Sequence, residues 1–154
     1  MKTHALLKKI TESSNSVVGL LLGAMLLTSC GAGGPAFKPV SPIPAGKGVV
    51  YVYRQSSFVG GGVFGTVKAN NKPITKIRNG GYFPYIAPPG NNHFSVTTET
   101  TNEANVMVEK GAEKYLKTTV GMGLFVGHLK FTEVSPELGK SEITGCKLLE
   151  PVSQ

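Results

Sequence analysis

The sequence contains no aspartate and no tryptophan, and it has only two cysteines. Because all nine acidic residues are glutamates, Ser-His-Asp triads, aspartate dyads, EF-hand loops and Walker-B aspartates are excluded. Its most apolar stretch, Val17–Leu27, has eleven residues, whereas a helix needs about 20 to cross a bilayer. With 154 residues, the chain has room for one ordinary domain and an accessory segment.

The N-terminal segment has the composition of an export signal. Three lysines within the first nine residues make a basic start, and the apolar stretch Val17–Leu27 follows after a polar run. Small residues, Thr28 and Ser29, come directly after the apolar stretch. A basic flank, a short apolar stretch and small residues are typical of a signal that is later removed. The sequence therefore predicts a signal peptide over residues 1–29.

Leu27-Thr28-Ser29-Cys30 resembles the bacterial lipobox, in which an aliphatic residue and two small residues precede a lipid-bearing cysteine. The resemblance implies that Cys30 becomes the N-terminus and carries a diacylglyceryl group and a further acyl chain such as palmitate. Two or more acyl chains hold a protein stably on a membrane. By the same resemblance, Gly31 points to the outer membrane, facing the periplasm, if the cell is Gram-negative. The alternative for Cys30 is a core cysteine.

Residues 30–47 are expected to form a tether. Four prolines and four glycines fall between Gly31 and Lys47, a composition that resists regular structure. In an extended polyproline conformation of roughly 3.1 Å per residue, such a segment reaches about 50 Å. A spacer between the lipid and a folded domain is the favoured interpretation, and a proline-rich ligand for a partner's groove is the alternative.

Residues 48–149 are predicted to form an all-β domain, followed by a tail at 150–154. Eight short segments of β-branched and aromatic residues recur about every eleven residues between turn signals, a pattern typical of a sandwich. They are Val49–Tyr53, Val63–Ala69, Ile74–Ile77, Tyr82–Ile86, Phe94–Thr98, Ala104–Val108, Tyr115–Val120 and Lys130–Val134. The first is continuously apolar, as in a strand buried on both faces. We expect an immunoglobulin-like or transthyretin-like β-sandwich of seven to eight strands.

A short C-terminal helix is predicted after the strands. Ser135 is a suitable cap, Pro136 suits the first helical position, and Glu137 lies in the first turn. Gly139 is expected to weaken the helix and Gly145 to end it.

Three stretches of the chain resemble an uncharacterised bacterial lipoprotein family. They are Val50–Arg54 with Ser57–Gly60, Asn79–Phe83 leading to Pro88–Gly90, and Val120–Gly123 with Phe125–Gly127. The resemblance implies a small exported β domain of unknown function and no particular reaction. The segment from Asn71 to Phe94 is also loosely similar to surface-layer repeats, which favours a sandwich.

Two features are candidates for a binding surface. The glycine run Gly60, Gly61 and Gly62 lacks the Lys-Ser/Thr of a phosphate loop and opens no helix, so a turn explains it best; otherwise it is a binding loop. In Tyr82-Phe83-Pro84-Tyr85, alternate residues of a strand face opposite ways. One of Tyr82 and Tyr85 could present a platform for a sugar or peptide, although a core role for these rings is favoured.

Motifs for chemistry are sparse. His93 and His128 lack the spacing of a metal site, so no metal and no cofactor are expected. Cys146 has one neighbouring lysine and no evident base, and we expect it to be buried and reduced, with an intermolecular disulfide as the alternative. A hydrolase would need a histidine to pair with one of the glutamates near strand ends. These are Glu99, Glu103, Glu109 and Glu113.

The charge balance is basic but dispersed, with a formal net charge of +7. Since the lysines form no stripe with aromatic residues, no nucleic-acid partner is expected. A mild positive field suits anionic lipid or glycolipid headgroups. The sequence thus predicts a non-catalytic, lipid-anchored envelope lipoprotein whose domain binds or assembles with an envelope protein or glycolipid. An envelope hydrolase and a lipid or ligand carrier are the alternatives.

Overall fold

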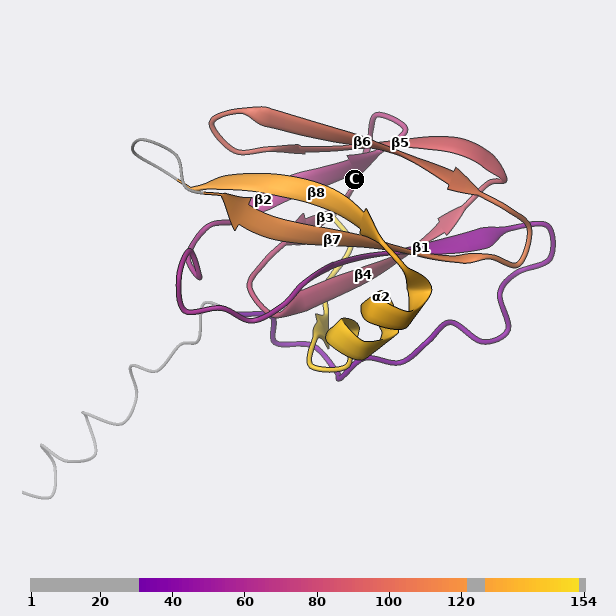
Figure 1. Cartoon of the computed structure of the whole chain (residues 1–154), viewed down its shortest axis with the longest axis horizontal. Coiled ribbons are helices and arrows are strands. Elements are labelled where there is room, and N and C mark those ends of the chain that lie inside the picture. Colours follow the sequence, from indigo (N-terminus) through magenta and orange to yellow (C-terminus); the bar gives the residue numbers. More distant parts are fainter. Residues whose placement is uncertain (1–30, 122–126, 153–154) are drawn as a thin grey trace, which may run out of the picture.

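A computed structural model of the chain describes residues 31–121 and 127–152, so the predictions for residues 1–30, Cys30 included, lie outside it. The described residues form two stacked β-sheets and one helix, α2 (Pro136–Ile143) (Figure 1). The strands are β1 (Gly48–Arg54), β2 (Gly65–Ala69), β3 (Lys72–Ile77), β4 (Gly81–Ala87), β5 (Gly90–Thr97), β6 (Thr101–Val108), β7 (Glu113–Gly121), β8 (His128–Val134) and β9 (Lys147–Leu148). The prediction of an all-β sandwich with a short C-terminal helix is confirmed.

The two sheets combine local hairpins with long-range pairings. One has the strand order β8-β7-β1-β4-β9 and the other the order β3-β2-β5-β6. Strand β1 pairs with β7 in parallel, which places Tyr51 opposite Tyr115, and β4 pairs in parallel with β9. The remaining strand pairs are antiparallel. Parallel partners need long connections, so turn signals alone could not predict this order.

Local turn chemistry explains where several strands end. Asn70 and Asn71 join β2 to β3 with positive φ values of 48° and 67°, a conformation that asparagine tolerates better than most residues. The predicted turn before β4 contains Gly80, whose φ is 66°. Pro84 lies within β4, where a proline suits an edge or a bulge because it has no amide hydrogen to donate. Because β9 pairs only with Gly81 and Tyr82, the side of β4 at Pro84 has no paired strand among the described residues.

The inner layer lies between the two sheets and consists of aliphatic side chains with phenylalanine. Val50, Val52 and Leu116 from the five-stranded sheet are fully buried there, as are Val67 and Phe94 from the four-stranded sheet. Together these side chains fill the space between the sheets. A strand of β-branched residues suits this position because its side chains pack on the pleated surface of the neighbouring sheet.

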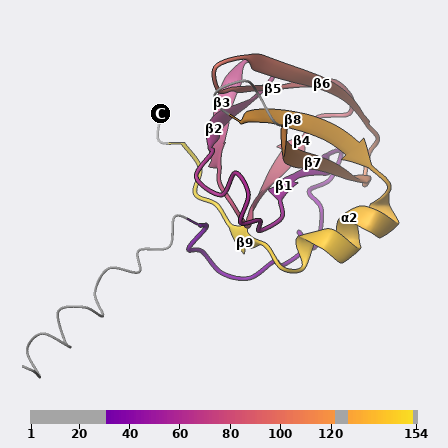
Figure 2. The same ribbon diagram turned by 60° about the vertical axis from the view of Figure 1, so that its left-hand side comes forward.

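A second, outer layer covers the opposite face of the five-stranded sheet. Tyr51, Tyr53, Tyr82 and Tyr115 lie in it with Ile143 from α2. The whole of β1 is consequently buried on both faces, as predicted. Figure 2 shows α2 and the N-terminal segment on the same side of this sheet.

Helix α2 lies very close to β7. Ser135 caps it by accepting a hydrogen bond from the Leu138 amide at 3.4 Å, as its sequence predicts. A Cβ atom placed on Gly139 would lie only 2.2 Å from Cγ of Tyr115, so glycine permits this close approach. Glu142 then accepts hydrogen bonds of 2.6 Å from Lys117 Nζ and from the Tyr53 hydroxyl. Within the described residues, no helix is long and apolar enough to span a membrane.

The segment predicted to be a tether differs in the structure from a free spacer. Phe37, Val40 and Ile43 pack against the outer layer, where the Phe37 ring lies edge-on to Tyr51 and Tyr82. Two backbone amides of the segment donate to tyrosine hydroxyls: Val40 to Tyr51 at 2.8 Å and Lys38 to Tyr82 at 3.2 Å. The composition correctly indicates a segment without regular strands or helices, but not its docking, because the partners come from distant strands.

The residues predicted to be a C-terminal tail also pack against the domain as far as they are described. Thr75 Oγ1 donates to the Glu150 carbonyl at 2.7 Å, and the Val152 amide donates to the Ile74 carbonyl at 3.1 Å. Residues 150–152 therefore cover the outer edge of β3. Residues 31–152 thus contain every described strand, the helix and both hydrophobic layers.

Candidate functional site

The loop between β1 and β2, residues 55–64, leaves the sandwich at the end where the described chain begins (Figure 1). Arg54, 2% exposed, anchors this loop from within: its Nη2 donates to the Gly60 carbonyl at 2.6 Å and its Nη1 donates to the Val63 carbonyl. Burial lowers the pKa of the Arg54 guanidinium. Arg54 thus binds two backbone carbonyls of the loop from the buried side, and the side chains of Phe58 and Val59 face solvent.

The predicted glycine loop forms the tip of this segment. Gly60 has a φ of 71°, and a Cβ atom there would lie 2.9 Å from Cγ1 of Val120, so both conformation and packing favour glycine. The two residues before it are apolar and exposed, Phe58 at 102% and Val59 at 68%. A binding role for Gly60, Gly61 and Gly62 stays a prediction, but the exposed apolar residues beside them were not anticipated.

Asn79 connects this loop to the first described residues. Its side-chain amide donates to the Ser57 carbonyl at 3.0 Å, and its Oδ1 accepts from the Ser57 amide at 2.9 Å. The Asn79 carbonyl accepts from the Ala32 amide at 3.0 Å. The start of the described chain and the 55–64 loop are thus fixed to one turn.

Two surface grooves flank Gly31. One, of about 520 Å³, has Phe58 and Lys147 in its lining; the other, of about 630 Å³, has Lys76, Arg78 and Glu150. The charged side chains around the two grooves are therefore three cations and one carboxylate. Both grooves open at the surface, on the same end of the sandwich.

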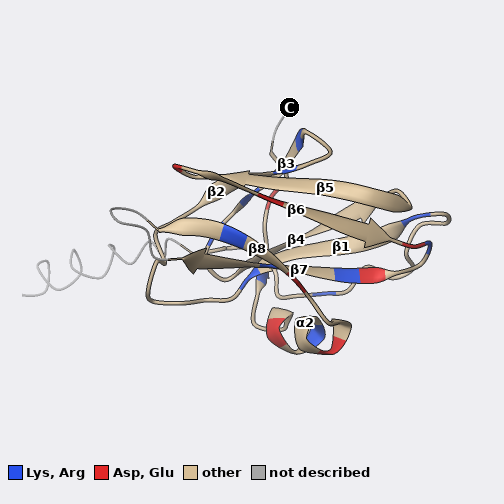
Figure 3. Cartoon of the chain, turned by 45° about the horizontal axis from the view of Figure 1, so that its top comes forward, with Lys and Arg blue, Asp and Glu red and all other residues tan. Residues whose placement is uncertain are grey.

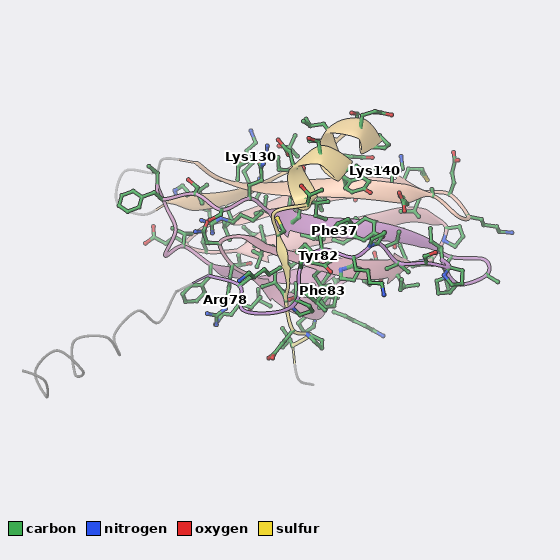
Figure 4. The ribbon with its side chains drawn as sticks, turned by 90° about the horizontal axis from the view of Figure 1, so that it is seen from below. Phe37, Arg78, Tyr82, Phe83, Lys130 and Lys140 are labelled. Atoms are coloured by element: carbon green, nitrogen blue, oxygen red, sulfur yellow. The ribbon has the colours of Figure 1, made fainter. Side chains whose placement is uncertain are left out.

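An aromatic ring links the cations to the loop. Phe64 is half exposed, and Lys76 Nζ lies 4.5 Å from the centre of its ring. The Arg78 guanidinium carbon lies 5.6 Å from the same ring, a cation–π geometry that positions both charges over an apolar surface. Figure 4 shows Arg78 at this end of the sandwich. Elsewhere Lys and Arg are spread over the molecule without forming a stripe (Figure 3).

The two tyrosines of the predicted platform lie on opposite faces of β4. Tyr82 is 2% exposed, and its ring centre lies 5.0 Å from that of Phe37. Figure 4 labels both residues. Tyr85 is partly buried against the inner layer and meets Phe94 edge-on at 5.6 Å. The structure does not bring the two rings together, and Tyr82 belongs to the core, the role that the sequence favours.

The candidate acid–base residues lie on the surface. His93 Nε2 is 3.5 Å from Glu103 Oε2 across β5 and β6, with the glutamate side chain 61% exposed. His128 Nδ1 lies 3.2 Å from the hydroxyl of Thr100. Neither histidine lines the grooves at Gly31. Over residues 31–121 and 127–152, no three His, Cys, Asp or Glu side chains gather closely enough to hold a metal ion.

Cys146 lies in the outer layer as a buried, free thiol. Its Sγ donates to the Arg54 carbonyl at 3.5 Å. Burial, with a smaller contribution from the Glu142 carboxylate, raises the pKa of this thiol to about 11. The thiolate needed for nucleophilic chemistry is therefore scarce at neutral pH.

A known protein family matches the part of the chain that contains the 55–64 loop. The model of a family of proteins of unknown function, DUF2846, matches residues 44–129. The chain belongs to the DUF2846 family. The match spans β1 to β7 with the 55–64 loop, and it ends before α2 and β9. No curated protein matches the chain.

Sequence reasoning missed the residues that build this end of the molecule. Arg54 ends a continuously apolar strand, and a charge in such a place is a signal for a buried hydrogen-bonding role. The sequence around Asn79 indicates a turn, but not that its side chain binds the backbone of Ser57, 22 positions away. Phe64 falls in the predicted segment Val63–Ala69, but β2 begins only at Gly65, and its contact with Lys76 and Arg78 was not anticipated.

Proposed function

We propose that this protein is a lipid-anchored lipoprotein of the cell envelope whose β-domain is a non-catalytic binding or assembly module. Leu27, Thr28 and Ser29 form the cleavage motif, and Cys30 carries the lipid. If the cell is Gram-negative, the anchor lies in the outer membrane and the domain faces the periplasm. The partner is another envelope protein or an anionic glycolipid.

A hydrogen bond close to the predicted cleavage site carries the proposal. Among the described residues, the Ala32 amide donates to the Asn79 carbonyl, so the chain is already bonded to the domain two residues beyond Cys30. Every described strand and every described member of the two hydrophobic layers comes after Cys30 in the sequence. A chain processed at Cys30 would therefore keep these described contacts, which supports the proposal.

The interior of the domain favours a binding module over a carrier or a hydrolase. Fully buried side chains of the inner layer, such as Val52, Phe94 and Leu116, occupy the space where a carrier would hold a lipid. The His93–Glu103 pair is solvent-exposed, whereas general acid–base catalysis depends on positioned groups with tuned pKa values. A solvated pair of this kind is typical of a protein surface.

Fatty-acid labelling in cells tests the anchor. Cells expressing the full chain are fed an alkyne fatty acid, and the labelled protein is compared between Cys30→Ala and the matched variant Cys146→Ala. We expect label on the unmodified chain and on Cys146→Ala, and none on Cys30→Ala. Equal labelling of the two variants, or no label on any chain, would contradict the proposal.

Cross-linking in intact cells tests the binding role. An envelope protein or glycolipid recovered on the domain is the expected result. Hydrolytic activity that is lost in Glu103→Gln would favour the enzyme alternative instead.

A further inference from the structure

The distance between the proposed lipid and the folded domain is very short. Ala32 is already bonded to Asn79, so only two residue steps, an extended length of about 7 Å, separate Cys30 from the domain. Gly31 lies between the two surface grooves and lines both of them. A chain held at Cys30 must therefore keep this end of the sandwich close to the bilayer.

The apolar residues at this end have no partner in the described fold. Phe58 is fully exposed at the tip of the 55–64 loop, with Val59 beside it. Arg54 and Asn79 hold the loop from behind through four hydrogen bonds, so the tip is presented on a fixed base. Exposed aromatic and aliphatic side chains of this kind suit the boundary between headgroups and acyl chains.

The charges at this end complement anionic headgroups. Three exposed cations border the grooves at Gly31: Lys76, Arg78 and Lys147. Among the described residues that line the two grooves, Glu150 is the one carboxylate. Cations next to an apolar tip combine electrostatic attraction to anionic lipids with burial of apolar surface.

We propose that this end of the sandwich rests directly on the lipid surface. Phe58 and Val59 enter the headgroup region, and Lys76, Arg78 and Lys147 contact anionic headgroups. The inference rests on the proposed lipidation of Cys30 and deepens it, because it fixes which end of the domain faces the membrane. Strand β1 runs from Gly48 to Arg54, so Gly48 and the residues packed against it lie at the opposite end.

A single tryptophan reports the contact, since the chain has none of its own. Residues 30–154 are coupled through Cys30 to a maleimide lipid in vesicles of phosphatidylcholine with about one quarter phosphatidylglycerol. Cys146 is 2% exposed with a pKa of about 11, so it does not compete for the maleimide. Cooperative unfolding of the uncoupled chain confirms that this piece is folded.

Phe58→Trp places the reporter at the tip, and Met107→Trp is the matched control. Met107 is also exposed, and it lies next to Val108, which packs against Gly48 at the opposite end. We expect brominated acyl chains to quench the tryptophan at position 58 with a blue-shifted emission, and to leave the one at position 107 unchanged. Equal quenching of both, or quenching of neither, would overturn the proposal.

Charge-matched variants test the electrostatic part on the uncoupled chain. Lys76→Gln with Arg78→Gln removes two cations near the loop, and Lys47→Gln with Lys110→Gln removes two exposed cations at the far end. We expect the first pair to weaken vesicle partitioning at least tenfold and the second to change it less than twofold. Phe58→Ser should cost about tenfold on its own. Equal losses from the two cation pairs would contradict an oriented contact.

The two proposals fail separately in these experiments. Chemical coupling supplies the anchor whether or not cells acylate Cys30, so an unlabelled protein in cells would overturn the lipoprotein assignment alone. Acylation in cells without quenching at position 58 would overturn the docking surface alone. A photo-cross-linker at position 58 that captures a protein rather than lipid in cells would also overturn it.

Discussion

The two faces of the five-stranded sheet are built from different chemistry. The inner face packs aliphatic side chains such as Val50, Val52 and Leu116 against a second regular sheet. The outer face presents Tyr51, Tyr53, Tyr82 and Tyr115 to α2 and to a segment without regular secondary structure. Both faces are buried, but among the described residues only the outer face packs against a segment whose backbone amides need hydrogen-bond partners from side chains.

Tyrosine hydroxyls explain how the outer face accepts an irregular segment. Backbone amides that are buried need hydrogen-bond partners, and a proline-rich segment cannot form a full ladder with a strand. The hydroxyls of Tyr51 and Tyr82 accept from Val40 and Lys38, while the rings bury the apolar parts. A proline- and glycine-rich segment therefore need not be a linker when a tyrosine-rich sheet lies beside it.

The largest expected effect comes from the inner face. Leu116 is fully buried between the sheets, so Leu116→Ala should lower the free energy of unfolding by about 3 to 4 kcal/mol through lost burial and a new cavity. Urea denaturation measures it, with the exposed Met107→Ala as control. A loss below about 1 kcal/mol would mean that the inner layer can collapse around the gap.

Alkaline pH should weaken the outer face specifically. The folded-state pKa of the Cys146 thiol, about 11, lies above its ordinary value of 9.0, so its stabilising contribution is fully present below pH 9 and is lost as pH rises to about 11. Burial likewise raises the pKa values of Tyr53 and Tyr115. We expect a loss on the order of 2 kcal/mol from the thiol alone.

Urea denaturation at several pH values checks this expectation. Cys146→Ala should make the pH dependence between 9 and 11 shallower, because it removes the thiol. A stability that stays constant up to pH 11 in the unmodified chain would contradict the buried position of these groups.

Gly139 offers a test in which the sign itself is informative. In a free helix Gly→Ala stabilises by about 1 kcal/mol, but here the added Cβ would lie 2.2 Å from the Tyr115 ring. We expect Gly139→Ala to destabilise by about 1 to 3 kcal/mol. Thermal and urea unfolding give the value, and Leu138→Ala on the exposed side of α2 is the control. A more stable Gly139→Ala variant would show that α2 is not held against β7.

The smallest expected loss of stability comes from the contact between Tyr51 and the docked N-terminal segment. Tyr51→Phe removes the acceptor of the Val40 amide and should cost about 1 kcal/mol. Hydrogen exchange at Val40 should become faster. Tyr115→Phe loses a bond to Glu113 instead and should leave exchange at Val40 unchanged. Equal exchange rates in both variants would contradict docking through the tyrosine hydroxyls.

Much of the fold could be predicted because its signals are local. The alternation and turn chemistry of eight segments correctly located β1 to β8, and the cap at Ser135 located α2. Strand β9 has only two residues, too few for a periodic pattern. The pairing of β1 with β7 joins residues more than sixty positions apart, and nothing in either segment encodes that choice.

The candidate site was less accessible to sequence reasoning. Gly60, Gly61 and Gly62 mark a candidate binding loop in the sequence, and its role stays a prediction. The base of this loop depends on Arg54 and Asn79, whose partners are known only once the strands are arranged. The docking of Phe37 depends on tyrosines from β1 and β4. Residues that act through distant partners carry no local signature.

Mass spectrometry of the intact protein from its native membrane tests most directly whether Cys30 is the lipid-bearing N-terminus. If Cys30 is the anchor, the purified chain begins at Cys30 and carries the added mass of a diacylglyceryl group with or without a further acyl chain. A chain that retains residues 1–29, or one that carries an unmodified thiol at Cys30, would contradict the anchor.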